Sequence, residues 1–580
     1  MKRKRRIARR ELSDPMPDFL QNHHPVLRRV LCARAVRSQN ELDHSLKRLL
    51  SPDRLLDIER AAALLDEAID AGRRIVVVGD YDADGATGCA LAVRALRRLG
   101  AEDVRFEVPD RLRHGYGLSA GIVDRVHRCH APDLIVTVDN GISSIEGAAR
   151  ARAHGIDLLI TDHHLPGDRL PEAQAIVNPN RSGDPFPSKH LAGVGVIFYV
   201  MCALRTHRRR RNREPAPRMD GLLDLVALGT VADLVPLDHN NRILVEQGLK
   251  RIRKGRGSSA GIRALLEAGK RSIEHASTSD LGFAVGPRLN AAGRLEDMRI
   301  GIECLLSDDE NEARRMAARL DAINRQRREL DARMQEDALE DLLALYGDAP
   351  VPEAAISLFK DDWHSGLIGI LASRLKERIH RPVAAFAPDA DPDSLRGSVR
   401  SIPGVHVRDL LADVSVRNPG LIMRFGGHAM AAGLTIVRSG LERFRSEFAD
   451  HASQVMTPGM REAVVDSDGE IAAADLGLDL ARKIRDIAPW GQKFPEPIFD
   501  GIFKMTDQRP VGAGSRHRRL RLLPPGSDRA LDAIAFNRPA PIPTDPQGMI
   551  RIAYRLAVNR FRGLERAELT VEEIEEVPAS

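Results

Sequence analysis

An acidic run stands directly after a short apolar stretch near residue 80. In Val78-Gly79-Asp80-Tyr81-Asp82-Ala83-Asp84-Gly85, carboxylates occupy every second position from 80 to 84. Alternate side chains of an extended segment point the same way, so Asp80, Asp82 and Asp84 are expected to converge at the end of a strand. Three like charges so close together are costly unless a cation neutralises them. The pattern therefore predicts a divalent metal site rather than a solvated acidic turn.

A calcium-binding EF-hand loop opens with the same letters, D-x-D-x-D-G. Counting from Asp80 puts Gly85 at the sixth position, as that loop requires, but Leu91 stands at the twelfth position instead of a bidentate glutamate. The apolar run before the acids predicts a strand, whereas an EF-hand loop follows a helix. We therefore exclude a calcium-sensing loop.

Further acids and imidazoles follow later apolar runs. Asp139 comes after the run 134–138, and the triplet Asp162-His163-His164 follows the run 158–160. Asp233 lies among small residues in 229–236, where a helix cap is the alternative interpretation. Carboxylates mixed with imidazole favour Mn²⁺ or Mg²⁺ over zinc, which prefers more nitrogen and sulfur. If one carboxylate bridges two ions, they can activate water and stabilise a leaving oxygen, which predicts phosphoester hydrolysis.

The elements that position these residues follow from hydrophobic patterning. Apolar runs at 75–78, 104–108, 134–138 and 158–160 alternate with helix-length segments from about residues 86, 119 and 143. Continuous apolar runs are typical of parallel strands buried on both faces, and the helices between them serve as crossovers. Ligands of such sheets lie beyond the carboxyl ends of the strands. The acids and imidazoles stand at those ends.

Beyond this sheet the pattern changes several times. The stretch 191–306 is largely helical, and a charged segment with helical spacing at Met316, Leu320, Ile323, Leu330 and Met334 predicts one long helix opened by a capping box at 307–310. A second α/β unit and spaced β-runs with glycine and proline turns follow. The expected domain bounds are a basic and helical segment at 1–69, a catalytic α/β domain with a helical portion at 70–306, a connecting helix at 307–347, a second α/β domain at 348–460 and a β-barrel at 461–580.

Composition excludes several classes of protein. The chain has 580 residues, a formal net charge of +5 and 43% hydrophobic residues, which fits a multidomain globular protein. Its five cysteines form no C-x-x-C pair, which argues against a disulfide framework or a structural zinc site and favours a reducing cytoplasm. No stretch approaches the roughly 20 apolar residues of a membrane span. The basic start, residues 1–6, is expected to be a frayed tail rather than a targeting signal.

The motifs, in chain order, resemble those of the DHH phosphoesterase superfamily, named for the triplet at 162–164. The stretches Pro287-Arg288-Leu289-Asn290-Ala291-Ala292-Gly293-Arg294 and Phe425-Gly426-Gly427-His428 narrow the resemblance to the RecJ family of bacterial single-stranded-DNA exonucleases, over residues 70–580. The resemblance implies an α/β multidomain fold with a parallel-sheet DHH domain, a long connecting helix, a second α/β DHH-associated domain and a C-terminal OB-like β-barrel. It also implies 5′-to-3′ hydrolysis of single-stranded DNA to 5′-mononucleotides in recombination and repair.

The resemblance further implies roles for individual residues. Two Mn²⁺ or Mg²⁺ ions would be held by carboxylates at 80, 82 and 84, with Asp139 bridging them and with His163 and Asp233 completing the second site. Asp162 would orient an imidazole, and His164 would face the scissile phosphate, either polarising it or helping to protonate the leaving group. All of these motif residues are present, which argues against an inactive relative.

A further set of residues is expected to hold DNA or its 5′ phosphate, because guanidinium groups, glycine amides and helix amino ends bind phosphate well. The set comprises Arg111, Arg113, Arg288, Arg294, His364, Ser398, Arg400, Gly426, Gly427 and His428. A solvated surface charge is the alternative for each arginine. On the β-barrel, Trp490, Phe494 and the basic stretch 516–521 could hold single strands, with core packing as the alternative for the phenylalanine. Gly115-x-Gly117 lacks the last glycine of a dinucleotide fingerprint, so NAD binding is not inferred.

Two other functions compete with the exonuclease interpretation. A nanoRNA or cyclic-dinucleotide phosphodiesterase would share the catalytic motifs, but the terminal β unit favours longer substrates. A noncatalytic single-strand-binding replication factor would be expected to carry degenerate metal motifs. The resemblance implies single-stranded DNA, single-strand-binding protein and recombination or repair helicases as partners, a monomer, no membrane association, and a bacterial cytoplasmic location at the nucleoid.

Overall fold

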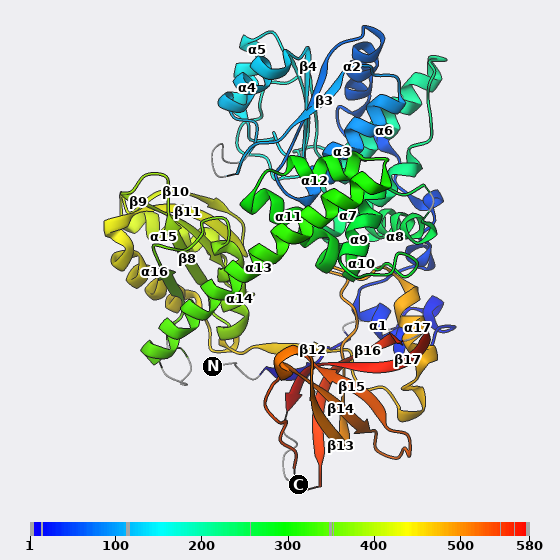
Figure 1. Cartoon of the computed structure of the whole chain (residues 1–580), viewed down its shortest axis with the longest axis vertical. Coiled ribbons are helices and arrows are strands. Elements are labelled where there is room, and N and C mark those ends of the chain that lie inside the picture. Colours follow the sequence, from blue (N-terminus) through cyan, green and yellow to red (C-terminus); the bar gives the residue numbers. More distant parts are fainter. Residues whose placement is uncertain are drawn as a thin grey trace.

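The computed structural model describes residues 5–12, 16–111, 117–255, 257–346, 351, 353–545, 547–561 and 563–575. Four bodies follow one another along the chain: an α/β sheet domain, a helical portion beneath it, a second α/β domain joined by one long helix, and a β-barrel (Figure 1). This arrangement agrees with the fold class expected from the sequence. The expected domain bounds themselves remain a proposal.

The first sheet is parallel throughout, with the strand order β3-β2-β4-β5-β6. Its strands are β2 (Ile75–Gly79), β3 (Val104–Glu107), β4 (Leu134–Val138), β5 (Asp157–Thr161) and β6 (Ala175–Val177). Crossover helices include α3 (Ala83–Arg98), α4 (Ala120–His130) and α5 (Ile145–Ala153). The register pairs Val78 with Thr137, and Thr137 with Ile160, so the carboxyl ends of the three central strands lie side by side. One edge of the sheet therefore collects the residues that follow these strands.

Helices after this sheet build the lower part of the first domain. Those that bear on the site are α6 (Gly193–Arg210), α7 (Leu223–Ala232), α9 (Ala260–Ala268), α11 (Gly286–Leu295) and α12 (Arg299–Leu306). One hydrophobic core joins them to the sheet, running from Leu65 and Val77 through Leu228 to Leu320. The sheet edge and these helices are thus parts of one packed body.

The predicted connecting helix is α13 (Glu310–Tyr346), a single helix of 37 residues that spans about 55 Å. Near its start Leu320 belongs to the core of the first domain, and near its end Leu342 belongs to a core of the second. The expected capping box at 307–310 is wrong, because Asp309 caps the helix alone by accepting from the amides of Asn311 and Glu312. The helix connects two separately packed domains.

The second α/β domain contains a mixed sheet in the order β10-β11-β9-β8-β7. Its strands are β7 (Ile356–Phe359), β8 (Val383–Pro388), β9 (Ser394–Arg400), β10 (Ile422–Gly427) and β11 (Ala431–Val437), with helices α14 (Ile368–Ile379), α15 (Val407–Arg417) and α16 (Leu441–Val455). On β9, buried Val399 alternates with half-buried Ser398 and Arg400. The sheet therefore keeps a polar face on this strand.

A closed five-stranded barrel ends the chain, in the order β13-β14-β15-β17-β16. Its strands are β13 (Phe499–Val511), β14 (His517–Leu523), β15 (Leu531–Ala535), β16 (Met549–Phe561) and β17 (Leu564–Glu575), preceded by β12 (Val464–Ser467) and α17 (Leu478–Ile487). The spaced β-runs that the sequence predicts after the second α/β domain correspond to these strands.

The basic start of the chain is attached to the barrel. Strand β1 (Arg6–Arg9) pairs in parallel with β12, and Arg9 bonds to the buried carboxylate of Asp500 at 2.9 Å. Arg34, on the same N-terminal segment, forms a buried ion pair with Asp468. The expectation of a frayed tail at residues 1–6 is therefore wrong for Arg5 and Arg6, because Arg5 pairs with the buried carboxylate of Glu573 and Arg6 lies in β1. Residues 1–4 lie outside the described residues.

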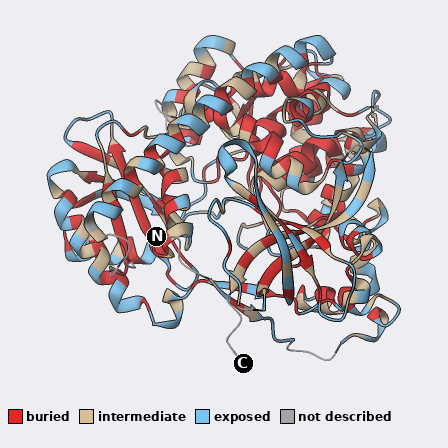
Figure 2. Cartoon of the chain, turned by 60° about the horizontal axis from the view of Figure 1, so that its bottom comes forward, coloured by how far each residue is buried: buried red, intermediate tan, exposed pale blue. Residues whose placement is uncertain are grey.

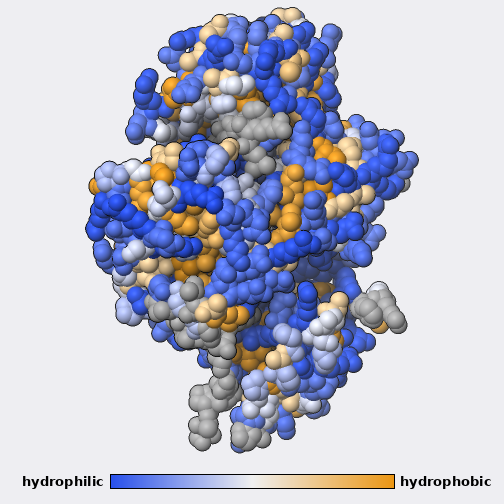
Figure 3. Space-filling view, turned by 60° about the vertical axis from the view of Figure 1, so that its left-hand side comes forward, coloured by the Kyte–Doolittle hydropathy of each residue, from blue (hydrophilic) through white to orange (hydrophobic). Residues whose placement is uncertain are grey.

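The distribution of buried residues follows the helices and strands of these bodies. Buried residues fill the strands and the inward faces of the helices, and exposed residues lie outside them (Figure 2). The side of the molecule that carries the second α/β domain is mainly hydrophilic, with separate apolar patches (Figure 3). Among the described residues, no helix combines the length and the apolarity needed to cross a membrane.

Candidate metal centre and nucleic-acid interface

A turn followed by a helix arranges the acidic run at the end of β2. Asp80 follows the strand, whereas Asp82 is the N-cap of α3, and its Oδ1 accepts from the amides of Asp84 at 2.9 Å and Gly85 at 3.0 Å. Asp84 already lies in the first helical turn. The expected alternation along an extended segment is wrong, since the three carboxylates converge through a strand-to-helix turn.

Helix α11 holds this turn from the other side. The side-chain oxygen of Asn290 accepts from the amide of Ala83 at 2.8 Å. A Cβ at Gly293 would lie 1.8 Å from the carbonyl oxygen of Tyr81, so only glycine permits this close approach. The stretch 287–294 thus contributes to the metal centre by packing α11 directly against the acidic turn.

The amino end of α6 fixes Asp84. Its carboxylate accepts from the amide of Gly193 at 2.6 Å and from the amide of Val194 at 2.9 Å. A helix amino end carries partial positive charge and unpaired amides, so it stabilises a carboxylate there. Asp84 is thereby held opposite Asp233, the residue that follows α7.

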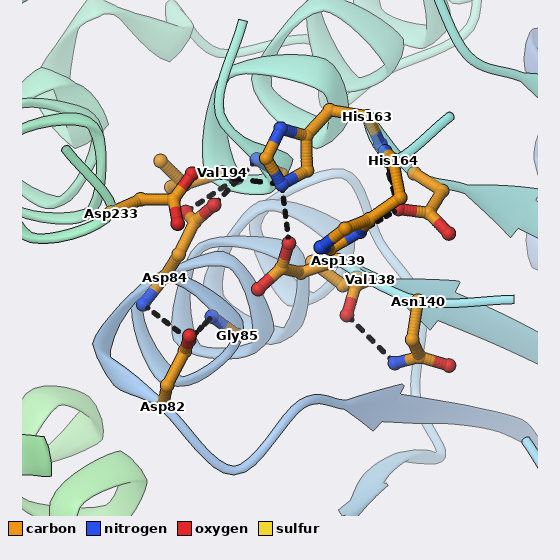
Figure 4. Close-up of polar contacts among 12 residues, drawn as sticks. Asp82, Asp84, Gly85, Val138, Asp139, Asn140, His163, His164, Val194 and Asp233 are labelled. Atoms are coloured by element: carbon orange, nitrogen blue, oxygen red, sulfur yellow. Dashed lines mark hydrogen bonds and ion pairs between the residues drawn. The ribbon is translucent and has the colours of Figure 1, made fainter. Parts of the chain in front are cut away.

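The structure brings all six predicted metal ligands together in overlapping groups. Within each group, one potential ligand atom of each residue lies within 4.8 Å of those of the other two residues. The three groups are Asp80 with Asp82 and Asp139; Asp84 with His163 and Asp233; and Asp139 with His163 and His164. His163 lies between them, with its Nε2 atom 3.0 Å from Asp139 Oδ1 and 3.6 Å from Asp233 Oδ2 (Figure 4). Asp139 belongs to two groups, the position that a bridging carboxylate requires.

Asp162 fixes the second histidine. It is fully buried, and its Oδ1 lies 2.7 Å from Nδ1 of His164. Burial disfavours the charged imidazole, but the hydrogen bond and the charge of Asp162 outweigh it and raise the pKa of His164 to about 9. Burial likewise opposes the charge of Asp162, but the contact with His164 outweighs burial and lowers the pKa of Asp162. The contact with Asp162 therefore favours the protonated imidazole and fixes the orientation of His164.

The electrostatics of the site favour a bound cation. Burial, followed by repulsion from other carboxylates, raises the pKa of Asp84 and of Asp233 to about 7 and raises the pKa of Asp80 and Asp139 well above the usual range. Among the described residues, Asp80 Oδ1 and Asp233 Oδ2 are buried and lack a hydrogen-bond partner. Divalent cations would bind these oxygens and remove the repulsion. Oxygen donors with one imidazole fit Mn²⁺ or Mg²⁺.

Several of the predicted phosphate-binding residues meet beside this centre. Arg294, at the end of α11, donates to the carbonyl oxygen of Gly366 in the second domain at 3.0 Å. Its burial, together with the charges of Arg111, Arg327 and Arg400, lowers the pKa of Arg294 to about 9. So many guanidinium groups around one buried arginine form a site with a strong preference for an anion.

Neighbouring residues of the second domain complete this cluster. Arg400 donates to the hydroxyl oxygen of Ser398 at 2.9 Å, and a Cβ on Gly369 of α14 would meet both side chains. His364 accepts from the amide of Gly366 through Nδ1 at 3.0 Å. Burial and then the charge of His164 lower the pKa of His428, which follows Gly426 and Gly427 of β10. The Arg294–Gly366 contact and the effect of His164 on His428 connect the second domain to the metal centre.

Other expected contacts differ. Arg288 is buried, and it donates to the carbonyl oxygen of Ala284 at 2.6 Å and to Asp321 of α13 at 2.7 Å, so its guanidinium joins two helices instead of facing DNA. Arg113 lies outside the described residues. The sequence reasoning did not include Arg327 on α13, because nothing in a charged helix marks which arginine turns toward another domain.

The aromatic residues proposed for the barrel serve packing. Trp490 and Phe494 stack with ring centroids 5.3 Å apart, and the guanidinium of Arg242 lies 4.2 Å from the Phe494 centroid. Both rings pack against the core of the first domain. Within 516–521, His517 forms an edge contact at 5.2 Å with Phe536, which is 48% exposed. Phe536 is thus an exposed aromatic side chain on the barrel, in contact with half-buried His517.

Two asparagines at the site went unnoticed in the sequence. Asn178 and Asn180 follow β6 and bond to the backbone of His164 and His163. The rule that ligand-site residues follow parallel strands could have found them, because β6 ends at the same edge as β5.

Comparison with known proteins identifies the family. Family models match the DHH family N-terminal domain at residues 74–230, the DHHA1 domain at residues 352–454 and the RecJ OB domain at residues 467–573. The single-stranded-DNA-specific exonuclease RecJ of Salmonella typhimurium is 47% identical over 99% of this chain and 100% of its own length. The chain belongs to the RecJ family. The resemblance inferred from the motifs is confirmed.

Solved RecJ structures share the fold. The structure of Thermus thermophilus RecJ in complex with Mn²⁺ has a TM-score of 0.79 and 30% identity, covering 96% of this chain and 76% of that one. The structure of the same protein in complex with Mg²⁺ has a TM-score of 0.73 and 28% identity, covering 96% and 75%. The predicted combination of DHH, DHH-associated and OB domains is therefore confirmed for this RecJ-family chain.

Proposed function

We propose that this chain is a Mn²⁺- or Mg²⁺-dependent exonuclease that degrades single-stranded DNA from the 5′ end and releases 5′-mononucleotides. The convergence of six ligand residues, three buried and three half-buried, beside a cluster of guanidinium groups carries the proposal. The similar RecJ proteins are named as single-stranded-DNA-specific exonucleases, and the Thermus structures hold Mn²⁺ and Mg²⁺.

The ligand groups would hold two ions. Asp80 and Asp82 would hold one ion, Asp84, His163 and Asp233 the other, and Asp139 would bridge them. Two bound ions supply an activated water and stabilise the departing oxygen of the phosphodiester. His164, held by Asp162, would bind the scissile phosphate or give a proton to the 3′ oxygen of the leaving nucleotide, and its raised pKa supports either role.

The arginine cluster supports the 5′-to-3′ direction. A terminal 5′ phosphate held by Arg294, Arg111 and Arg400 would put the next phosphodiester over the metal groups. Cleavage that frees a 5′-mononucleotide leaves the scissile phosphate on the shortened strand as its new 5′ phosphate. The same cluster can then bind that phosphate, so one geometry serves each successive turnover.

Two experiments test the proposal. Single strands labelled at either end, with and without a 5′ phosphate, are incubated with the protein and Mn²⁺; we expect early release of the 5′ label and slower turnover without the phosphate. Release of the 3′ label first would overturn the direction. The variants Asp82→Ala and His163→Ala should lose Mn²⁺-dependent hydrolysis and retain DNA binding, and full activity in both would overturn the site assignment.

The wider setting follows from the family resemblance. We propose a role in DNA recombination and repair in the bacterial cytoplasm at the nucleoid, as a monomer that works with single-strand-binding protein and repair helicases. The RecJ OB domain supports contact with strands longer than a dinucleotide. Sedimentation of the purified chain tests the monomer, and co-sedimentation with single-strand-binding protein tests that partnership.

A further inference from the structure

The turn after β6 holds the backbone of both site histidines. The side-chain amide of Asn178 donates to the carbonyl oxygen of His164 at 2.9 Å, and that of Asn180 donates to the carbonyl oxygen of His163 at 2.5 Å. On the opposite side, Asp162 Oδ1 accepts from the amide of His163 at 2.7 Å and from that of His164 at 3.1 Å. The N–H and the C=O of each histidine are therefore fixed by groups on two neighbouring strand ends.

We propose that Asn178 and Asn180 are positioning residues with separate tasks: Asn180 sets His163 for metal binding, and Asn178 sets His164 for the phosphate. The inference rests on the proposed function, since it assigns both asparagines to the reaction of that site. Because a side chain follows its own backbone, a carbonyl released from its donor lets the peptide rotate and carries the imidazole away from its target.

The turn itself is rigid, which makes the two donors effective. Asn178 is fully buried, and its Oδ1 accepts from the amide of Asn180 at 2.8 Å, the pattern of an Asx-turn. The guanidinium of Arg181 donates to Asp57 at 2.7 Å and to the carbonyl oxygen of Ile176 at 2.5 Å. An Asx-turn alone needs only the side-chain oxygen of Asn178. The amide nitrogens that point at the histidines are additional, and the turn does not require them.

Asparagine-to-aspartate substitutions separate the two tasks. Asn178→Asp keeps the oxygen that the turn uses and removes the donor to His164, and Asn180→Asp removes the donor to His163 at nearly constant volume. Asn311, an exposed residue in the first turn of α13, provides the matched control Asn311→Asp. The measurements on the full chain are Mn²⁺ affinity by titration, kcat and KM on a 5′-phosphorylated single strand, and thermal unfolding.

We expect a split between the two variants. Asn180→Asp should weaken Mn²⁺ binding about 10- to 100-fold, the range found when groups behind metal ligands are removed. Asn178→Asp should lower kcat by a similar factor, with Mn²⁺ affinity and KM near those of the wild type, and Asn311→Asp should change none of them. If an aspartate variant fails to fold, Asn178→Ser and Asn180→Ser, which also lack the amide donor, are measured instead.

The results that would contradict the positioning roles differ from those that would contradict the proposed function. Unchanged Mn²⁺ affinity and kcat in both variants of an active enzyme would overturn the positioning roles and leave the proposed function intact. Parallel losses of both quantities in step with thermal stability would assign the asparagines a purely structural role. A wild-type protein that binds Mn²⁺ but hydrolyses no DNA would instead overturn the proposed function, while the Mn²⁺ titration of Asn180→Asp would still test the His163 assignment.

Discussion

A single methyl group added at the amino end of α6 should disable the metal centre. A Cβ on Gly193 would lie 2.5 Å from Cβ and 2.7 Å from Oδ1 of Asp139, the proposed bridging ligand. The amide of the same glycine donates to Asp84 at 2.6 Å. Gly193→Ala therefore displaces two proposed ligands that belong to different metal groups.

The geometry sets the size of the effect. Ordinary contact begins near 3.4 Å, so the alanine methyl group and Asp139 must separate by about 0.9 Å. A misplacement of about 1 Å at a reacting centre costs about 100-fold in rate, which corresponds to about 2.7 kcal/mol in activation free energy. Alanine is a better helix former than glycine, so the helix itself is not expected to weaken.

Gly195, on the same helix, supplies the control. The three atoms nearest to a Cβ there all belong to the Leu191 side chain, and the nearest lies at 3.3 Å. Both alanine variants are assayed for Mn²⁺-dependent release of a 5′-labelled nucleotide from single-stranded DNA, with circular dichroism to monitor folding. We expect Gly195→Ala to stay within about threefold of the wild type. Wild-type activity in Gly193→Ala would refute the reasoning, as would equal losses in the two variants.

Three further outcomes follow from the structure. Asp233→Asn should weaken Mn²⁺ binding by more than about 100-fold in calorimetric titration, since it removes a ligand rather than a supporting group. Arg9→Gln should lower the free energy of urea unfolding by about 1 kcal/mol because it strips one partner from buried Asp500, whereas Arg6→Gln, whose partner is exposed, should not. Blunt duplex should be digested far more slowly than a single strand of the same sequence, and equal rates would argue against selection of single strands at the Arg294–Gly366 contact of the two α/β domains.

Much of this site could be predicted because its residues follow short apolar runs that can be recognised in the sequence. Buried parallel strands appear as apolar runs, and parallel topology places the residues after each run at one edge, so Asp80, Asp139 and Asp162 could be grouped before any coordinates were known. The prediction was wrong about how Asp84 is brought close to the other carboxylates. Its position depends on the amides of Gly193 and Val194, more than a hundred residues away, and no local pattern encodes such a contact.

Arginines were harder to predict for a physical reason. The same guanidinium binds phosphate or a protein carboxylate, and the choice depends on which acid the fold brings near. Arg288 and Arg294 lie in one stretch of α11, but Asp321 of α13 engages Arg288, and Arg294 points to the second domain. The prediction of a frayed N-terminal tail failed for the same reason, because the acids that its arginines neutralise lie at the opposite end of the chain.

The contact between Arg294 and Gly366 connects the metal centre to substrate choice. Arg294 belongs to the helix that packs on the acidic turn, and Gly366 belongs to the loop before α14, so the two α/β domains touch beside the ligand groups. In the proposed reaction, a strand end that reaches the ligand groups would pass the guanidinium groups at this contact. A lone strand can do so with its backbone alone, whereas a paired strand would bring a second backbone against the same junction and would have to open the domains or unpair. On this reasoning, we expect the proposed selectivity for single strands to depend on the junction held by α13 rather than on the metal ligands.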